Sequence, residues 1–121
     1  MARKRIMLAE DDPTMVNLLK TLLKIEGFEV VALDAEGDIA AAVCEQRPDA
    51  LLMDVHLSEQ NGLEILDAIR ESDAACDVRV IMTSGMNLKE ECLRRGADGF
   101  LLKPFMPDDL IAMLKKSLNL S

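Results

Sequence analysis

Short runs of consecutive apolar residues alternate along the chain with longer segments in which apolar positions recur every three or four residues. Runs that are apolar nearly throughout are typical of strands covered on both faces, and the longer spacing is typical of amphipathic helices. Regular alternation of the two predicts an α/β fold, a parallel sheet with helices on both sides. The predicted strands are Ile6–Ala9, Glu29–Leu33, Ala50–Asp54, Val78–Thr83 and Phe100–Leu102.

Cap and turn residues set the ends of five predicted helices. The first opens with Asp12 as N-cap and Pro13 at its first position, and Gly27 ends it. The second stops before Pro48, because a residue that precedes proline avoids the helical conformation. The segment Val55–Asn61 is predicted to be a loop. The later helices are predicted at Ile39–Gln46, Leu63–Glu71, Leu88–Arg95 and Leu110–Leu118, the last opened by Pro107-Asp108-Asp109.

Composition narrows the class of protein. At 121 residues with 50% hydrophobic content, the chain suits a single domain, residues 1–121, with a core of its own. The net charge of −8 argues against direct binding to nucleic acid, and Arg3-Lys4-Arg5 is too small a basic footprint to change that. No apolar run is long enough to span a bilayer, and no signal-peptide core follows the basic start. We therefore expect a cytoplasmic protein without a membrane partner.

The cysteines do not indicate a metal site or a disulfide. Cys44, Cys76 and Cys92 are widely spaced, form no CxxC pair and are accompanied by one histidine, His56. A Cys/His zinc site is therefore disfavoured, and reduced thiols that fill the core are expected.

Candidate chemistry lies where the predicted strands end. Asp54 closes an otherwise apolar strand, and a buried carboxylate is costly unless it is paired or bound to a cation. Ligands of such sheets bind beyond the carboxyl ends of the strands, so residues at those ends are expected to form one site around Asp54. The companions that follow the first, fourth and fifth strands are Glu10-Asp11-Asp12, Ser84 and Lys103.

Carboxylates a few ångströms apart repel one another unless a cation intervenes. Their hard oxygens suit Mg²⁺, so Glu10 and Asp11 are predicted to hold this ion, with Asp54 completing the set. Lys103 and Ser84 offer an ammonium and a hydroxyl group to phosphate oxygens. A carboxylate nucleophile, a metal and phosphate donors are what phosphoryl transfer requires, and the product would be an aspartyl phosphate.

Four segments, in order along the chain, carry a family resemblance. They are IMLAEDD at Ile6–Asp12, PDALLMD at Pro48–Asp54 with Gly62 eight residues on, VIMTSG at Val80–Gly85, and GADGFLLKPF at Gly96–Phe105. Over essentially its whole length, the chain resembles a response-regulator receiver domain (CheY-like). The resemblance implies a flavodoxin/CheY-like doubly wound sandwich, with a five-stranded parallel sheet of strand order 2-1-3-4-5 and five helices.

The resemblance implies that Asp54 is the phosphoacceptor of a two-component signal transduction system. Asp54 would take its phosphoryl group from a histidine kinase or phosphotransfer protein, and the domain would catalyse only its own phosphorylation and slow autodephosphorylation. The Mg²⁺ ligands would be Glu10, Asp11, Asp54 and the backbone carbonyl of His56. Alignment of the strand and of the following helix start makes Glu10 and Asp11 the acidic pair, and Asp11 with Asp12 is the alternative.

The resemblance also implies a switch. Ser84 would bond the phosphoryl group and move toward it, and Phe100 would rotate after Ser84. Lys103 would contact the phosphate, and the Lys103–Pro104 peptide would be cis, as in the family. The switch would change binding to an unidentified effector protein or output domain.

The chain departs from the family pattern at several positions. Ser58 stands where proline is usual, which leaves the Val55–Asn61 loop less constrained, and His56 and Met86 flank the phosphoryl site. The interval from Ser84 to Gly96 is about three residues short, which predicts a short fourth helix.

Two other classes of function stay open. The short fourth helix favours a receiver-like protein that binds partners without phosphate, whereas the presence of Asp54, Ser84 and Lys103 opposes it. A metal-dependent phosphatase or nuclease would need an Asp-x-Asp pair, where this chain has Asp54-Val55-His56.

Overall fold

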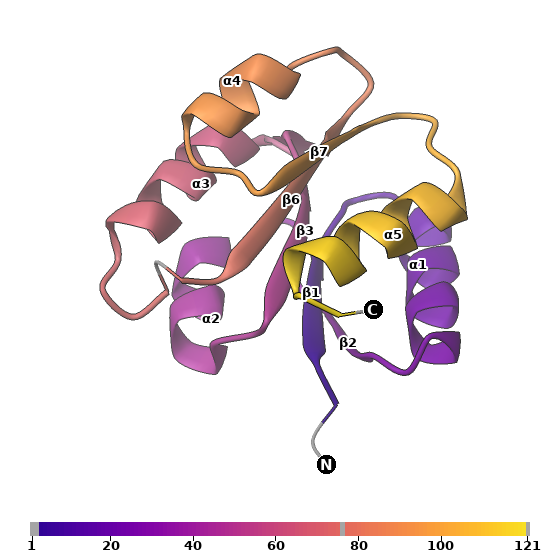
Figure 1. Cartoon of the computed structure of the whole chain (residues 1–121). Helices are drawn as coiled ribbons and strands as arrows, with labels where there is room; N and C mark the ends of the chain where they lie inside the picture. The colour runs from indigo at the N-terminus through magenta and orange to yellow at the C-terminus, as the bar shows by residue number, and fades with distance from the viewer. Residues whose placement is uncertain (1–2, 76, 121) are drawn as a thin grey trace.

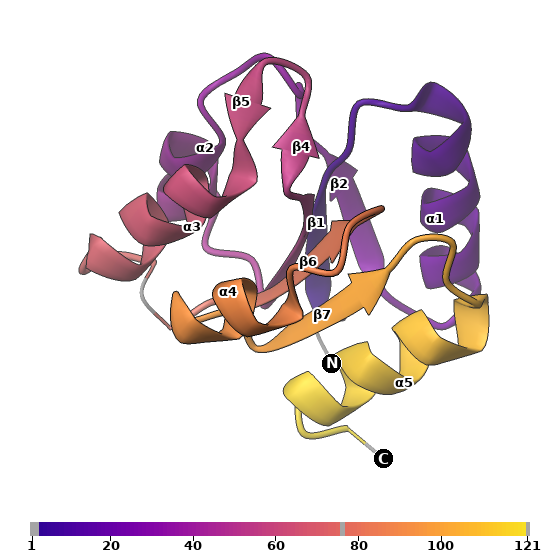
Figure 2. The same cartoon turned by 90° about the horizontal axis from the view of Figure 1, so that it is seen from above.

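A parallel sheet runs through the middle of the molecule, with helices on both of its faces (Figures 1 and 2). The computed structural model describes residues 3–75 and 77–120. The order of the five strands across the sheet is β2-β1-β3-β6-β7, which confirms the predicted order 2-1-3-4-5. The bounds of these strands are β1 (Arg5–Ala9), β2 (Glu29–Ala32), β3 (Ala50–Asp54), β6 (Arg79–Ser84) and β7 (Gly99–Leu102).

Two helical layers cover the sheet and form two separate cores. Helices α1 and α5 pack on one face, and α2, α3 and α4 on the other (Figure 1). Side chains of a strand alternate between faces, so Leu52 of β3 enters the α1–α5 core while Leu51 and Met53 enter the other. The helix bounds are α1 (Pro13–Ile25), α2 (Ile39–Gln46), α3 (Gly62–Glu71), α4 (Lys89–Arg94) and α5 (Pro107–Ser117).

Strand β3 is the most deeply covered element of the sheet. It lies between β1 and β6 in a parallel register, and all five of its residues are buried, including the terminal Asp54. Helices on both faces explain why the strand is apolar without alternation. The last residue of this covered strand therefore reaches the carboxyl edge of the sheet with little contact with water.

Most predicted boundaries agree with the structure to within one to three residues. Asp12 is the N-cap of α1 and accepts a hydrogen bond from the amide of Thr14 at 3.0 Å, as the sequence predicts. Helix α4 has six residues and is one residue shorter than predicted at each end, because Leu88 and Arg95 occupy its caps. Cys44 and Cys92 are free thiols, and Cys76 lies outside the described residues.

The prediction for the segment after β3 was wrong. Val55–Asn61 is not a plain loop but contains β4 (His56–Leu57) and β5 (Gln60–Asn61), two short antiparallel strands joined by Ser58 and Glu59. Two-residue strands have too few positions to show hydrophobic alternation, and among the residues of β4 and β5 Leu57 is the buried one. We call residues 55–61 the β4–β5 hairpin.

Within the described part of the chain, no helix has both the length and the apolar character needed to cross a membrane.

Candidate functional site

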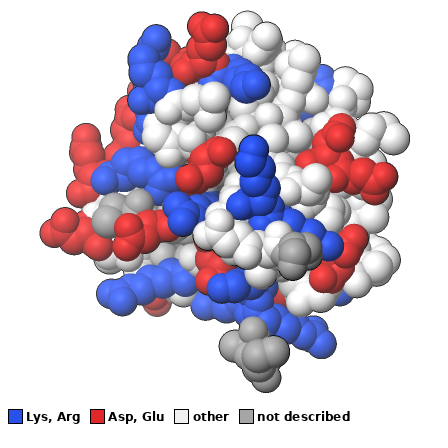
Figure 3. Space-filling view, in the orientation of Figure 1, with Lys and Arg blue, Asp and Glu red and all other residues white. Residues whose placement is uncertain are grey.

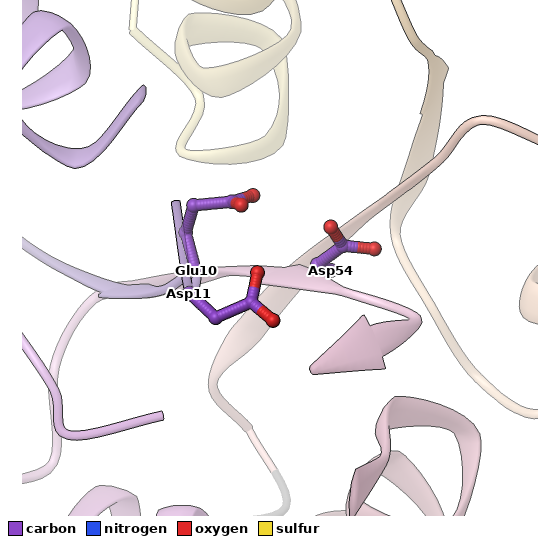
Figure 4. A group of neighbouring side chains, drawn as sticks. All are labelled: Glu10, Asp11 and Asp54. Carbon is purple, nitrogen blue, oxygen red and sulfur yellow. The ribbon is translucent and has the colours of Figure 1, made fainter. Parts of the chain in front are cut away.

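The ends of four parallel strands bring the predicted side chains to one edge of the sheet. Asp54 ends β3 and Ser84 ends β6, while Glu10 follows β1 and Lys103 follows β7. Figure 4 shows Glu10, Asp11 and Asp54 side by side at this edge. One carboxylate oxygen from each of the three lies within 4.8 Å of the other two. The sheet topology thus gathers residues that are far apart in the sequence.

The ammonium group of Lys103 binds two of the three carboxylates. Its Nζ donates to Asp54 Oδ2 at 2.6 Å and to Glu10 Oε2 at 2.9 Å. The side chains of Glu10 and Asp54 are only 7% and 10% exposed, so little water screens their charges. Asp54 Oδ1 accepts a third hydrogen bond, from the amide of His56 at 3.0 Å. Both oxygens of Asp54 are therefore held in place.

Two pKa shifts describe the electrostatics of the site. Burial raises the pKa of the Glu10 carboxyl above its usual range, although the hydrogen bond and charge of Lys103 oppose the shift. Burial alone would lower the pKa of Lys103, but its hydrogen bonds to Asp54 and Glu10, together with their charges, raise it. Lys103 is therefore a cation at neutral pH. Burial therefore disfavours the ionised form of Glu10, and Lys103 offsets only part of this effect.

The acidic run after β1 divides into two roles. Asp11 is exposed and accepts a hydrogen bond from the amide of Ser58 at 2.8 Å. The carboxylate of Asp12 turns instead to the first turn of α1, which it caps. The cluster that could hold a metal consists of Glu10 and Asp11 with Asp54, and Asp12 is not part of it.

Ser84 and Phe100 lie beside this cluster on adjacent strands. Ser84 is fully buried, and its Oγ accepts a hydrogen bond from the amide of Met86 at 3.0 Å. Phe100 is 8% exposed and packs in the core between the sheet and α2, α3 and α4. Strand alternation places Ser84 on that same face, because Met82, two residues earlier, lies in the same core. Ser84 and Phe100 therefore lie on neighbouring strands and on the same face of the sheet.

The β4–β5 hairpin fits closely around the end of β3. A Cβ atom at Gly62 would lie 2.5 Å from the carbonyl oxygen of Asp54, so only glycine fits there. The side-chain amide of Gln60 donates to the carbonyls of Ala35 and Gly37, at 2.8 and 2.9 Å. Sequence reasoning noted Gly62 by its spacing but missed Gln60 and the amide of Ser58, since backbone donors leave no mark in the side-chain pattern. The Lys103–Pro104 peptide is cis, as the family resemblance implies.

The donor set suits a magnesium ion. Mg²⁺ is a small, hard cation that binds carboxylate oxygens. One carboxylate oxygen from each of Glu10, Asp11 and Asp54 lies within 4.8 Å of the other two, so the three could face one small cation. Three carboxylates beside the ammonium of Lys103 also leave an excess of negative charge for a cation to balance.

Comparison with known proteins agrees with this geometry. Residues 6–115 match the family model of the response regulator receiver domain. The DNA-binding response regulator MtrA of Mycolicibacterium smegmatis is 31% identical over 97% of this chain, which covers 51% of MtrA. The chain thus spans about half the length of this relative.

Two solved structures have the same fold. The receiver domain of a sensor histidine kinase from Pseudomonas aeruginosa, with a magnesium ion coordinated in its active-site cleft, is 27% identical with a TM-score of 0.85, covering 98% of this chain and 99% of that one. A CheY-like response regulator receiver domain protein from Methanospirillum hungatei is 29% identical with a TM-score of 0.84, covering 98% of this chain and 95% of that one.

Proposed function

The chain belongs to the response regulator receiver domain family, and from this membership we propose that Asp54 accepts a phosphoryl group from the phosphohistidine of a histidine kinase or phosphotransfer protein. As a receiver domain of two-component signalling, the protein is not a typical enzyme. We propose that it catalyses only its own phosphorylation and slow autodephosphorylation. The convergence of Asp54 with Glu10, Asp11 and Lys103 is the observation that supports this proposal.

In the proposed transfer, a carboxylate oxygen of Asp54 forms a bond to phosphorus as the phosphorus–nitrogen bond of phosphohistidine breaks. The electron pair of the broken bond stays with the imidazole nitrogen. Asp54 needs no general base, because an ionised carboxylate is already nucleophilic. Its hydrogen bonds to Lys103 and to the amide of His56 orient it toward the incoming group.

Glu10, Asp11, Asp54 and the backbone carbonyl of His56 would hold Mg²⁺. When bound, the ion would balance negative charge on the phosphoryl oxygens. Lys103 stays protonated because of its raised pKa and contacts the phosphoryl group as a second positive charge. Without these positive charges, the carboxylates would repel an approaching anionic phosphoryl group.

Ser84 and Phe100 form the proposed switch. The Ser84 hydroxyl would leave the amide of Met86 and donate to a phosphoryl oxygen of phosphorylated Asp54. Phe100 would rotate into the space that Ser84 vacates on the same face of the sheet. Phosphorylation of Asp54, which adds negative charge at one residue, would thus change the shape of the protein surface near β7.

The wider setting is also a proposal. We propose that residues 1–121 form one receiver domain in the cytoplasm, and that the switch changes binding to an effector protein or output domain. Direct binding to nucleic acid or to a membrane is not part of the proposal, because the net charge is −8 and acidic and basic side chains are interspersed on the face in Figure 3.

Intact-mass measurement after incubation with Mg²⁺ and a small phosphodonor tests the proposal. We expect the addition of one phosphoryl group to the wild type and to Asp49→Asn, and none to Asp54→Asn. Asp49 is a matched control, because it directly precedes β3 and an asparagine there can still accept the hydrogen bond from the amide of Arg5. A wild type without adduct would reject phosphoacceptance and favour a receiver that binds partners without phosphate.

A further inference from the structure

The turn of the β4–β5 hairpin contacts a candidate metal ligand through its backbone. The amide of Ser58 donates to Asp11 Oδ2 at 2.8 Å, across 47 positions of sequence. Ser58 has a positive φ of 55°, which non-glycine residues rarely adopt. The two-residue connection between Leu57 and Gln60 requires this conformation, because such tight hairpin turns need a positive φ.

Serine at this position is compatible with the turn in a way that proline is not. Proline fixes φ near −65° and has no backbone N–H. A proline at position 58 could therefore neither adopt the observed turn nor donate to Asp11. The difference from the usual family pattern at Ser58 thus coincides with a specific contact to the acidic cluster.

Contacts on both sides hold the hairpin in position. Gln60 donates from its side chain to the carbonyls of Ala35 and Gly37, in the connection between β2 and α2. Asn61 caps α3 through the amide of Leu63 at 2.9 Å. These contacts therefore hold the Ser58 amide in place, as a free loop would not.

We propose that Ser58 is a positioning residue for Mg²⁺ binding, which acts through its amide on Asp11. The proposal rests on the proposed function, because it takes Asp11 as a ligand of that site. Asp11 is exposed, so without the amide its carboxylate would sample several orientations, and ordering it would cost entropy. Holding Oδ2 leaves Oδ1 available to the cation, as outer partners do for ligands of other metal sites.

Three variants at one position test this proposal. Ser58→Pro removes both the amide donor and the positive φ, whereas Ser58→Gly keeps the donor and favours the positive φ. Ser58→Ala keeps the donor and removes only the hydroxyl group. Titration of the protein with Mg²⁺ alone, followed by calorimetry, is expected to show about tenfold weaker binding for Ser58→Pro. Ser58→Gly and Ser58→Ala are expected to bind within twofold of the wild type.

Two further measurements separate positioning from a general loss of structure. Phosphorylation by a small phosphodonor should need more Mg²⁺ for half-maximal rate in Ser58→Pro, with little change in the rate at saturating Mg²⁺. The amide of Ser58 in the wild type should be protected from hydrogen exchange, measured by nuclear magnetic resonance without metal.

Equal Mg²⁺ affinity in Ser58→Pro and the wild type would overturn the proposal, as would an unprotected Ser58 amide. These results are distinct from a failure of the proposed function. If the wild type takes no phosphoryl group but Ser58→Pro still binds Mg²⁺ more weakly, the positioning role stands and phosphoacceptance fails. If the wild type is phosphorylated and all variants bind Mg²⁺ equally, the positioning role fails alone.

Discussion

The two ends of the parallel sheet both carry charged side chains, but they balance those charges differently. At the carboxyl end, three carboxylates lie together, and the two that bind the ammonium of Lys103 are at least 90% buried. At the amino end, Asp98 is flanked by Arg70 at 2.9 Å and Arg79 at 3.8 Å. The amino-end carboxylate is paired with two arginines and partly hydrated, whereas the carboxyl-end carboxylates outnumber the ammonium of Lys103 and two of them are desolvated.

This difference separates structural charge from functional charge. Arg70 donates to the carbonyls of Val78 and Gly96 as well as to Asp98, so its role is to join α3 to the starts of β6 and β7. The acids at the carboxyl end are hydrogen-bonded as well, but Lys103 is the one ammonium of the described residues that binds Glu10 and Asp54, so the clustered carboxylates also repel one another. We infer that a local excess of carboxylates over cations distinguishes the functional site in this fold. Charged residues alone do not, because both ends of the sheet carry them.

The largest expected effect is at Asp54. Asp54→Asn should abolish phosphorylation while leaving the free energy of unfolding unchanged or higher, because it removes one of three mutually repelling charges. Asp98→Asn should do the reverse, lowering the free energy of unfolding by about 1–2 kcal/mol with phosphorylation retained. Intact mass and urea denaturation measure the two effects. If both variants lost phosphorylation, the conclusion that the amino end has only a structural role would be wrong.

The next largest effect concerns Arg70. Arg70→Ala removes the donors to Val78, Gly96 and Asp98, and should lower the free energy of unfolding by about 2–3 kcal/mol. Denaturation curves with an unchanged slope would show that the loss is one of stability alone. The Mg²⁺ affinity of the folded protein should stay within twofold of the wild type, and a large fall in affinity would show that the two ends are coupled.

Magnesium should stabilise the protein through the carboxyl end only. At tenfold excess over its dissociation constant, Mg²⁺ should raise the free energy of unfolding by about 1.4 kcal/mol, and a chelator should reverse the gain. Asp11→Asn should reduce this gain, because it removes one negative charge from the cluster. The gain should persist in Asp98→Asn, which serves as the control. Thermal unfolding with and without Mg²⁺ provides the measurement.

The smallest effect is expected at the exposed pair of Lys4 and Asp49. Their side chains are 47% and 38% exposed, and 3.9 Å separates the charged atoms. Lys4→Ala should change the free energy of unfolding by less than about 0.5 kcal/mol, because solvent screens such pairs. Urea denaturation at low and high salt measures it, and a loss above 1 kcal/mol would show that the amino end depends on more than its paired interior charges.

The sequence predicts the carboxyl end of the sheet better than the amino end for a physical reason. Parallel strands share one carboxyl edge, so Asp54, Ser84 and Lys103 could be placed together once the strands were recognised. The partners of Asp98 could not be predicted, because Arg70 and Arg79 are two of many basic residues and their pairing depends on the three-dimensional register. Charged residues are frequent on every surface, so their pattern alone does not identify pairs.

The β4–β5 hairpin marks the other limit of sequence reasoning. Its strands have two residues each, and its contacts to Asp11 and Asp54 come from the backbone of Ser58 and His56. Neither hydrophobic periodicity nor residue type reports a backbone donor. The same holds for the switch residues, since the burial of Ser84 and Phe100 describes one state, and their proposed movement stays a prediction.

The close fit of Gly62 against the carbonyl of Asp54 has a consequence for how such a domain can evolve. The amide of Gly62 also donates to the carbonyl of Val55 at 2.6 Å, so the start of α3 is held directly against the end of β3. Between these two elements, His56 and Glu59 point to solvent and are free to vary in chemistry. Substitutions at these exposed positions can therefore change the chemical surroundings of Asp54 one residue at a time. The position of the Asp54 carboxylate stays the same.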